Sequence, residues 1–289
     1  MECKPVNQPK DEMTNTHADP RASSVQRPGG GSSAIGDRAR LVWFLARSEL
    51  GRRFAGTAGG VLWAALGPVL MIGVVWFALD VGLGLRASIG PDYGVALIVG
   101  MVAWQLISES INDSTSIITR NSHLVKKIVF SVELLPVASA VAAGILHMAL
   151  LAVLLPALAF MGLLSWGTLW QLPVWFALLF ATITVLNLLV ATLNVVFRDL
   201  SAIVPFILSA AFWLTPVVWM SDKLPGPWRA VALANPFALA VEGYRAALLG
   251  RPLPFTSATA AASVLVVVCI GALSCYLFRL FRPDFADYL

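Results

Sequence analysis

Few side chains in this 289-residue chain have both the type and the position to transfer protons or make bonds. Asp80 and Glu109 lie near the ends of long apolar runs, and His147 lies in the middle of one. Ionisable residues within membrane helices often form proton relays. A lone histidine among Ala, Leu and Val is more often a hydrogen-bonded packing residue, so both interpretations stay open for His147.

Motifs for nucleotide or metal binding are missing from the sequence. It contains no GxxxxGK[ST] P-loop, no HExxH pair and no Cys/His cluster. Cys3 lies in a polar segment, and Cys269 and Cys275 lie in the last apolar run, so we expect all three to be inert. The sequence therefore predicts no metal or cofactor bound by this chain, and energy for any active transport must come from a partner.

Six long apolar runs must position these side chains. They cover residues 61–79, 93–111, 134–164, 172–197, 203–220 and 258–278. A bilayer core requires about 20 apolar residues in a helix. Apolar residues make up 58% of the chain and charged residues 12%, against roughly 25% charged in soluble domains. We therefore predict an all-α integral membrane protein with six transmembrane helices.

The chain before the first run divides into two segments. Residues 1–36 are polar, rich in Pro, Gly and Ser, and contain no apolar signal segment, so we expect a disordered cytoplasmic tail. Residues 37–60 mix Trp43, Leu50 and other apolar residues with arginines, which favours an N-terminal amphipathic helix in the inner interface over a soluble linker helix. Residues 37–289 then form the membrane domain.

The flanks of the runs predict the topology. Arg and Lys are more frequent on the flanks that face the cytoplasm if the N-terminus is cytoplasmic. Six spans return the C-terminus to the same side. Because the basic residues flank spans and form no single patch, we expect membrane lipid as a partner and no nucleic acid.

Two connections are too long to be simple turns. Residues 112–133 mix polar and apolar side chains, which predicts a short helix across the cytoplasmic face. Residues 221–257 predict two short helices that re-enter the outer face and form a gate. The run 134–164 exceeds one bilayer thickness, and we expect Pro136 and Pro156 to kink it or mark its ends.

A series of short motifs follows the runs in order. They are RFAGT (53–57), GVLW (60–63), GP (67–68), GMVAW (100–104), LVKKIVF (124–130), ELLP (133–136), NVVFRDL (194–200), WLTP (213–216), NP (235–236) and YR (244–245). Together they resemble the membrane subunit of ABC exporters for lipid-linked polysaccharides, the O-antigen, teichoic acid and galactan exporter family. The resemblance covers residues 38–289.

The resemblance implies partners for the chain. Such permeases are homodimers that bind two cytoplasmic ATPase subunits, and ATP and Mg²⁺ bind in those subunits. Residues 112–124 would be the coupling helix, with Asp113, Ser116, Arg120 and His123 facing the ATPase. A solvated loop is the alternative for this segment.

Arginines at the edges of the runs are candidates for binding a lipid headgroup. Arg198 and Asp199 fall where the family has a gate helix, and Arg198 could hydrogen-bond a lipid pyrophosphate. An Arg–Asp pair that caps the next helix is the alternative. Arg52 and Arg53 could contact the same anionic headgroup, or could simply anchor the chain at the cytoplasmic face.

Aromatic residues could form a path for the glycan, because pyranose rings pack their C–H faces on aromatic rings. The candidates are Trp63, Trp104, Phe130, Phe197, Phe212, Trp213 and Trp219. The alternative for each is the aromatic belt at the membrane interface. Asn187 and Asn194 share one face of the fourth run and either join helices or line a hydrated path.

The sequence therefore predicts the transmembrane subunit of an ATP-driven exporter of polyprenyl-pyrophosphate-linked polysaccharide in a bacterial inner membrane. The chain itself would not be an enzyme. A drug- or lipid-exporting ABC permease is one alternative, and a narrow apolar pathway would favour it. A membrane-embedded enzyme of cell-envelope glycan assembly is the other, and it would require Asp, Glu or His clustered near one face.

Overall fold

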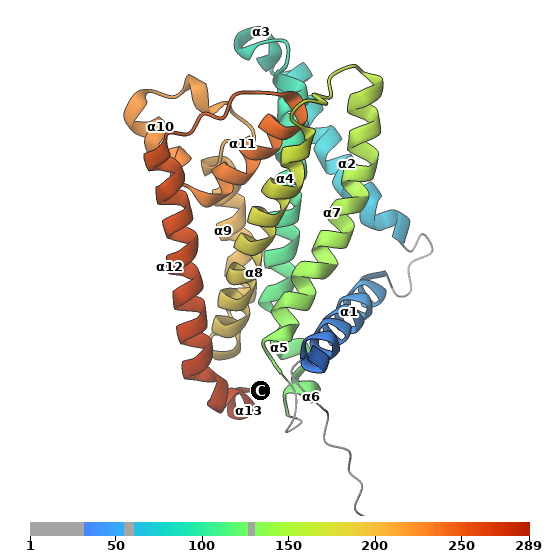
Figure 1. The fold of residues 1–289 in the computed structure, drawn as a ribbon, viewed down its shortest axis with the longest axis vertical. Helices are drawn as coiled ribbons and strands as arrows, with labels where there is room; N and C mark the ends of the chain where they lie inside the picture. The colour runs from blue at the N-terminus through green and yellow to red at the C-terminus, as the bar shows by residue number, and fades with distance from the viewer. Residues whose placement is uncertain (1–31, 55–60, 127–130) are drawn as a thin grey trace, which may run out of the picture. The chain divides into compact units, whose positions relative to one another are not determined.

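The computed structural model describes residues 32–54, 61–126 and 131–289, and within these residues it contains helices and no strand (Figure 1). Residues Arg38–Leu289 form one compact unit. Met1–Asp37 form another unit, of which only residues 32–37 are described, in the first turns of α1 (Ser32–Phe54). Most of the predicted tail at 1–36 thus lies outside the described residues.

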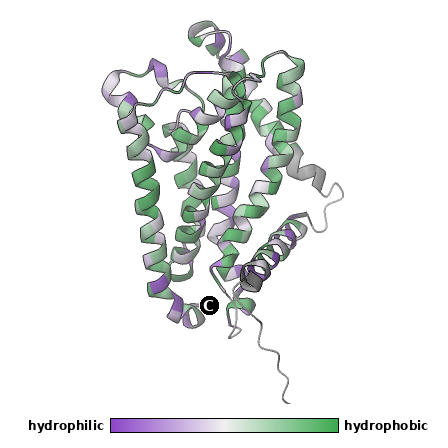
Figure 2. Ribbon diagram, in the orientation of Figure 1, coloured by the Kyte–Doolittle hydropathy of each residue, from purple (hydrophilic) through white to green (hydrophobic). Residues whose placement is uncertain are grey.

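Four helical segments are long and apolar enough to cross a membrane. The first is α4 (Tyr93–Thr115) and the second is α7 (Leu134–Phe160). The third, Leu169–Val196, combines η2 (Leu169–Gln171) with α8 (Leu172–Val196). The fourth, Ser257–Asp284, combines α12 (Ser257–Phe281) with η4 (Arg282–Asp284). Figure 2 shows hydrophobic colouring along most of α7, α8 and α12. These segments confirm the predicted class, a helical integral membrane protein.

The first and fifth apolar runs form shorter helices than the other four. The first comprises α2 (Val61–Trp76) and a π-helical turn, η1 (Phe77–Gly82), and a short α3 (Leu85–Ile89) follows. The fifth comprises α9 (Leu200–Leu214), which ends before the predicted residue 220 because Thr215 is extended, with ψ of 144°. The third run ends at Phe160, because Gly162 adopts a positive φ of 71°.

The long connections contain short helices, as predicted. The first holds α5 (Ile117–Arg120) and α6 (Ser122–Val125), each a single turn. The second holds η3 (Ser221–Lys223), α10 (Gly226–Leu233) and α11 (Pro236–Leu249). The chain ends in α13 (Phe285–Tyr288).

Helix α4 organises the packing of the unit. It contacts α2, α3, α5, α7, α8, α9 and α11, and 72% of its most apolar window is buried, against 17% for Ser257–Asp284. A second apolar cluster joins α1 and α5 to α13 through Leu45, Ile117 and Phe285. Because α4 contacts seven other helices, polar side chains on its faces can meet residues from many parts of the chain.

Candidate functional site

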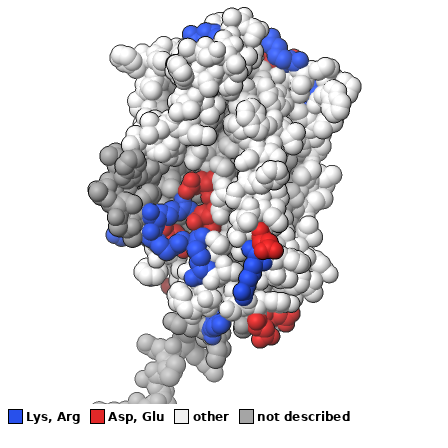
Figure 3. Space-filling model, turned by 180° about the vertical axis from the view of Figure 1, so that it is seen from behind, with Lys and Arg blue, Asp and Glu red and all other residues white. Residues whose placement is uncertain are grey.

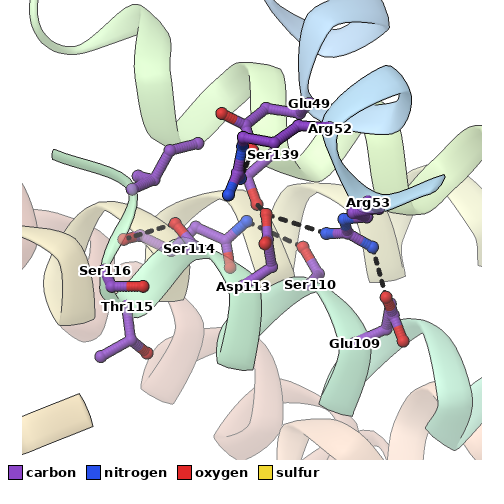
Figure 4. A network of polar contacts seen from close by, with 12 residues as sticks. Glu49, Arg52, Arg53, Glu109, Ser110, Asp113, Ser114, Thr115, Ser116 and Ser139 are labelled. Carbon is purple, nitrogen blue, oxygen red and sulfur yellow. Dashed lines mark hydrogen bonds and ion pairs between the residues drawn. The ribbon is translucent and has the colours of Figure 1, made fainter. Parts of the chain in front are cut away.

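The C-terminal half of α4 carries two carboxylates that meet arginines from α1 and α5. Figure 4 shows these carboxylates, Glu109 and Asp113, beside Arg53 of α1. Glu109 and Asp113 are four residues apart, so they share one helix face. Arg53 forms ion pairs with both, and its Nη2 lies 2.8 Å from Asp113 Oδ2. Arg120 approaches the other oxygen of Asp113 at 3.0 Å.

Glu49 extends this set of charges along α1. Its side chain is buried, pairs with Arg52 three residues later, and lies 3.4 Å from Arg120 Nη2. We name Glu49, Arg52, Arg53, Glu109, Asp113 and Arg120 the ionic cluster. Figure 3 shows acidic and basic side chains gathered side by side on one face, with a large uncharged surface beyond them.

The ionic cluster changes the interpretation of the four predicted coupling residues. Asp113 accepts a hydrogen bond from Ser139 Oγ of α7 at 2.9 Å, and Arg120 donates to Ser116 Oγ. Asp113 and Arg120 therefore face other helices of the chain. His123 is exposed on α6. The segment that carries these residues is thus fixed to α1 and α7 by ion pairs and hydrogen bonds.

A charged hollow of about 530 Å³ opens beside the ionic cluster. Its lining residues are Arg53, Gln105, Ser108, Glu109, Asn112, Asp113 and Arg120. Two guanidinium groups and two carboxylates thus line one space. The Arg53 side chain is 14% exposed and that of Arg52 is 48% exposed, so Arg52 is the more accessible of the two predicted headgroup arginines.

An aromatic groove of about 520 Å³ lies between α2, η1, α4 and α9. Three predicted path residues, Trp104, Phe212 and Trp213, line it. The ring centroid of Phe212 lies 5.6 Å from that of Trp104 and 5.4 Å from that of Trp213. Such spacings are typical of stabilising aromatic pairs. The structure therefore brings Trp104 together with two residues that lie more than 100 positions later in the sequence.

The other predicted aromatic residues lie elsewhere. Trp219 is half-buried and donates from Nε1 to the carbonyl of Trp213 at 2.9 Å, so it lies next to the groove. Phe197 is exposed after the end of α8 and does not line the groove. The side chain of Trp63 and all of Phe130 lie outside the described residues.

The charged hollow and the aromatic groove meet on α4. Gln105, Ser108 and Asn112 line both of them. These residues recur at spacings of three and four, so they follow one face of the helix. One continuous surface therefore runs from the ionic cluster to the aromatic groove.

Arg198 is held by the C-terminal segment. Its Nη2 donates to the carbonyl of Tyr288 at 2.8 Å, and the residue remains exposed beside a hollow of about 360 Å³. Asp199 stands at the start of α9 without a side-chain cap bond, and within the described residues it forms no ion pair with Arg198. Asn194 caps α9 instead, because its Oδ1 accepts from the Ser201 amide at 3.0 Å.

Arg245 of α11 is fully buried, which the sequence analysis did not predict. It donates to the carbonyls of Ala96, Pro216 and Val217 at 2.7–2.9 Å and lies 3.2 Å from Glu242 Oε1. A Cβ at Gly100 would lie 2.9 Å from Arg245 Nη2, so this glycine leaves room for the guanidinium. Arg245 therefore joins α11 to α4 and to the turn that follows α9.

The two mid-span polar residues with open interpretations both make packing contacts. His147 is buried, lies 2.9 Å from the Tyr244 hydroxyl through Nε2, and stacks on Phe176. Asn187 is buried and hydrogen-bonded to Ser110 Oγ at 2.8 Å. These contacts favour helix packing over a proton relay or a hydrated path.

Comparisons with known proteins identify the family of the chain. Residues 40–249 match the family described as ABC-2 type transporter. A protein named O-antigen export system permease protein RfbA from Klebsiella pneumoniae is 27% identical over 209 residues, which are 71% of this chain and 78% of that protein. One of the same name from Myxococcus xanthus is 29% identical over 257 residues, which are 86% of this chain and 94% of that protein.

Proposed function

The chain belongs to the ABC-2 type transporter family, and from this premise we propose that it is the transmembrane subunit of an ATP-driven exporter of polyprenyl-pyrophosphate-linked polysaccharide. The names of the two similar permeases support a polysaccharide cargo. Export would take place across a bacterial inner membrane. The chain is the permease and not an enzyme, and ATP with Mg²⁺ binds in a separate ATPase subunit.

The continuous surface along α4 is the observation that carries this proposal. It combines aromatic rings with hydroxyl and amide side chains over two hollows of about 520 and 530 Å³. Sugars present both C–H faces and hydroxyl groups, so a glycan fits both parts of this surface. A drug- or lipid-exporting permease would instead be expected to have a narrow apolar path without the amide side chains of Gln105 and Asn112.

The proposed topology has six spans with both termini in the cytoplasm. Four spans are the long apolar helices, and α2 with η1 and α9 supply the two shorter ones. Helix α1 lies in the inner interface, with Trp43 and Phe44 exposed to lipid. Helices α10 and α11 re-enter from the outer face and form the gate.

The proposed assembly is a homodimer with two ATPase subunits. Helices α5 and α6 dock on the ATPase through the exposed His123 and neighbouring residues. The ionic cluster then carries movement of this segment to α1 and α4, because Arg120 pairs with carboxylates on both helices. Arg52 and Arg198, which are more exposed than Arg53, meet the lipid pyrophosphate at the inner edge.

Deletion of the gene in its native host tests the function. We expect the lipid-linked glycan to accumulate inside the cell and to disappear from the surface, and the wild-type gene to restore export. Purification of the tagged permease in mild detergent should yield an ATPase with Walker motifs in comparable amount. Unchanged surface glycan after deletion would contradict a polysaccharide cargo, and a permease without an ATPase after crosslinking would contradict ATP-driven transport.

The remaining alternative is a membrane-embedded enzyme of envelope glycan assembly. The carboxylates in the ionic cluster make it worth testing, although Glu49, Glu109 and Asp113 are each paired with arginine. An enzyme would leave the lipid-linked precursor chemically unfinished in the deletion strain. A permease would leave it complete and on the inside, so mass spectrometry of the precursor separates the two.

A further inference from the structure

Three polar residues follow the exposed face of α4 between the ionic cluster and the aromatic groove. Gln105 and Ser108 are half-buried, and Asn112 is exposed. Seven residues separate the first from the last, which is about 10 Å along a helix. We name Gln105, Ser108 and Asn112 the polar stripe.

The amides of the polar stripe have no partner in the described part of the chain. No hydrogen bond joins the side chain of Gln105 or Asn112 to another described residue, whereas the amides of Asn187 and Asn194 on α8 are both engaged. The Ser108 hydroxyl donates to the Gln105 carbonyl at 3.3 Å and can still accept. The stripe therefore offers donors and acceptors into the space between the two hollows.

Unpartnered amides are costly at this depth. Gln105 lies near the middle of α4, whose residues Tyr93–Thr115 form one of the four long apolar segments. A polar group that has no hydrogen-bonding partner is strongly disfavoured in hydrocarbon. A polar residue that faced only lipid would be expensive here, so the stripe must face water or a polar ligand.

The stripe's chemistry indicates what kind of ligand it takes. An amide both donates and accepts, and it carries no charge, so it suits neutral hydroxyl groups better than phosphate or a metal ion. The rings of Trp104 and Phe212 lie along the adjoining groove and suit the C–H faces of a sugar. A lipid chain would use the rings and leave the amides unpaired.

We propose that Gln105, Ser108 and Asn112 form a hydrogen-bonding track for the hydroxyl groups of the exported glycan, so that α4 binds sugar units directly. This inference rests on the proposed function. The charged end of the surface receives the headgroup, and the stripe binds the uncharged sugars that follow it.

Photocrosslinking in the native host tests the track in the intact transporter. A diazirine amino acid replaces Gln105 or Asn112, and in a matched control it replaces Leu265 of α12, which is 62% exposed on an apolar helix. After illumination, the purified permease is probed for vicinal diols by periodate oxidation and hydrazide labelling. Its intact mass reports any attached lipid.

The outcomes separate the track from the function itself. Diol-positive adducts at positions 105 and 112, with none at 265, are the expected result. Lipid adducts alone at 105 and 112, or no diol-positive adduct there in a strain that still exports glycan, would overturn the track and leave the proposed function standing. Unchanged surface glycan in the deletion strain would overturn both.

Substitutions provide a second measurement. We expect Gln105→Leu and Asn112→Leu each to lower the initial export rate at limiting glycan by roughly 2- to 12-fold, because one hydrogen bond is lost. Gln105→Asn keeps the amide and should recover part of the rate. Gln171→Leu, an amide substitution in η2 away from the groove, is the control. Equal rates for Gln105→Leu and Gln171→Leu, at equal protein levels by immunoblot, would contradict the track.

Discussion

Replacement of Arg245 should destabilise the protein more than replacement of any exposed arginine. The guanidinium is fully buried and donates to the carbonyls of Ala96, Pro216 and Val217, with Glu242 beside it. Arg245→Met removes these donors at once and leaves a buried carboxylate. Breaking a buried ion pair by removing one partner costs about 3–5 kcal/mol, so we expect a loss of at least about 3 kcal/mol in the free energy of unfolding.

The free energy of unfolding can be measured by titrating the purified permease from mild detergent into SDS while tryptophan fluorescence is followed. Arg251→Met is the matched control, because Arg251 is half-buried and its side chain makes only a weak 3.4 Å hydrogen bond to Met220 Sδ among the described residues. We expect that variant to change stability by about 0.5 kcal/mol or less. Arg245→Lys keeps the charge but not the planar guanidinium group, so its loss in the free energy of unfolding should lie between those of Arg245→Met and Arg251→Met.

A double variant checks the cause. If the unpaired, buried Glu242 carboxylate causes most of the loss in unfolding free energy, then Glu242→Gln should restore part of the stability in the Arg245→Met background, although it destabilises the wild type. A loss below about 1 kcal/mol for Arg245→Met would refute the reasoning, because three carbonyls and a carboxylate could not then depend on this side chain.

Three further predictions concern other contacts. Glu49→Gln should weaken the ionic cluster and lower export at a given rate of ATP hydrolysis. The loss in the free energy of unfolding should be only about 1 kcal/mol, because its partner Arg52 is half-exposed. An unchanged ratio of export to ATP hydrolysis would argue against a role of the ionic cluster in coupling the two. Gly243→Ala places a Cβ 2.3 Å from the Trp175 ring, so we expect about 1–3 kcal/mol of destabilisation by SDS titration, and no change would mean that the ring moves freely. Phe285→Ala should lower the free energy of unfolding by about 3–5 kcal/mol, because its ring is buried against Phe278 with centroids 5.7 Å apart. Proteolysis of the C-terminal segment should accelerate in the same variant, and an unchanged rate of proteolysis would contradict this account.

The helices could be predicted from the sequence because apolar runs are long and local. The ends of the runs were less predictable. The extended Thr215 shortened the fifth run, and a π-helical turn ended the first run at Gly82 where residue 79 was predicted. Both differences arise from backbone geometry that hydropathy does not encode.

The site was predictable only in part. Trp104, Phe212 and Trp213 were predicted from residue type, and their convergence on one groove required the fold. The pairing of Arg53 with Glu109 joins residues 56 apart, so no local pattern indicates it. Glu49 was overlooked, although its place three residues before Arg52 is a helical ion-pair spacing.

The burial of Arg245 was the largest omission. The sequence analysis predicted two short re-entrant helices within residues 221–257 and included Arg245 only in the YR motif. In the structure the same residue lies at the contact of α11 with α4. Glu242, three residues earlier, was the available signal, because buried arginines need a charged or carbonyl partner.

The charged hollow has an even balance of sign, with Arg53 and Arg120 opposite Glu109 and Asp113. A transporter that held a phosphate between two unpaired guanidinium groups would bind it tightly and release it slowly. Here each arginine already has carboxylate partners, so an arriving anion must compete for them and gains little net attraction. If the proposed lipid pyrophosphate enters here, we expect its residence time in the hollow to be short, which favours rapid turnover over affinity.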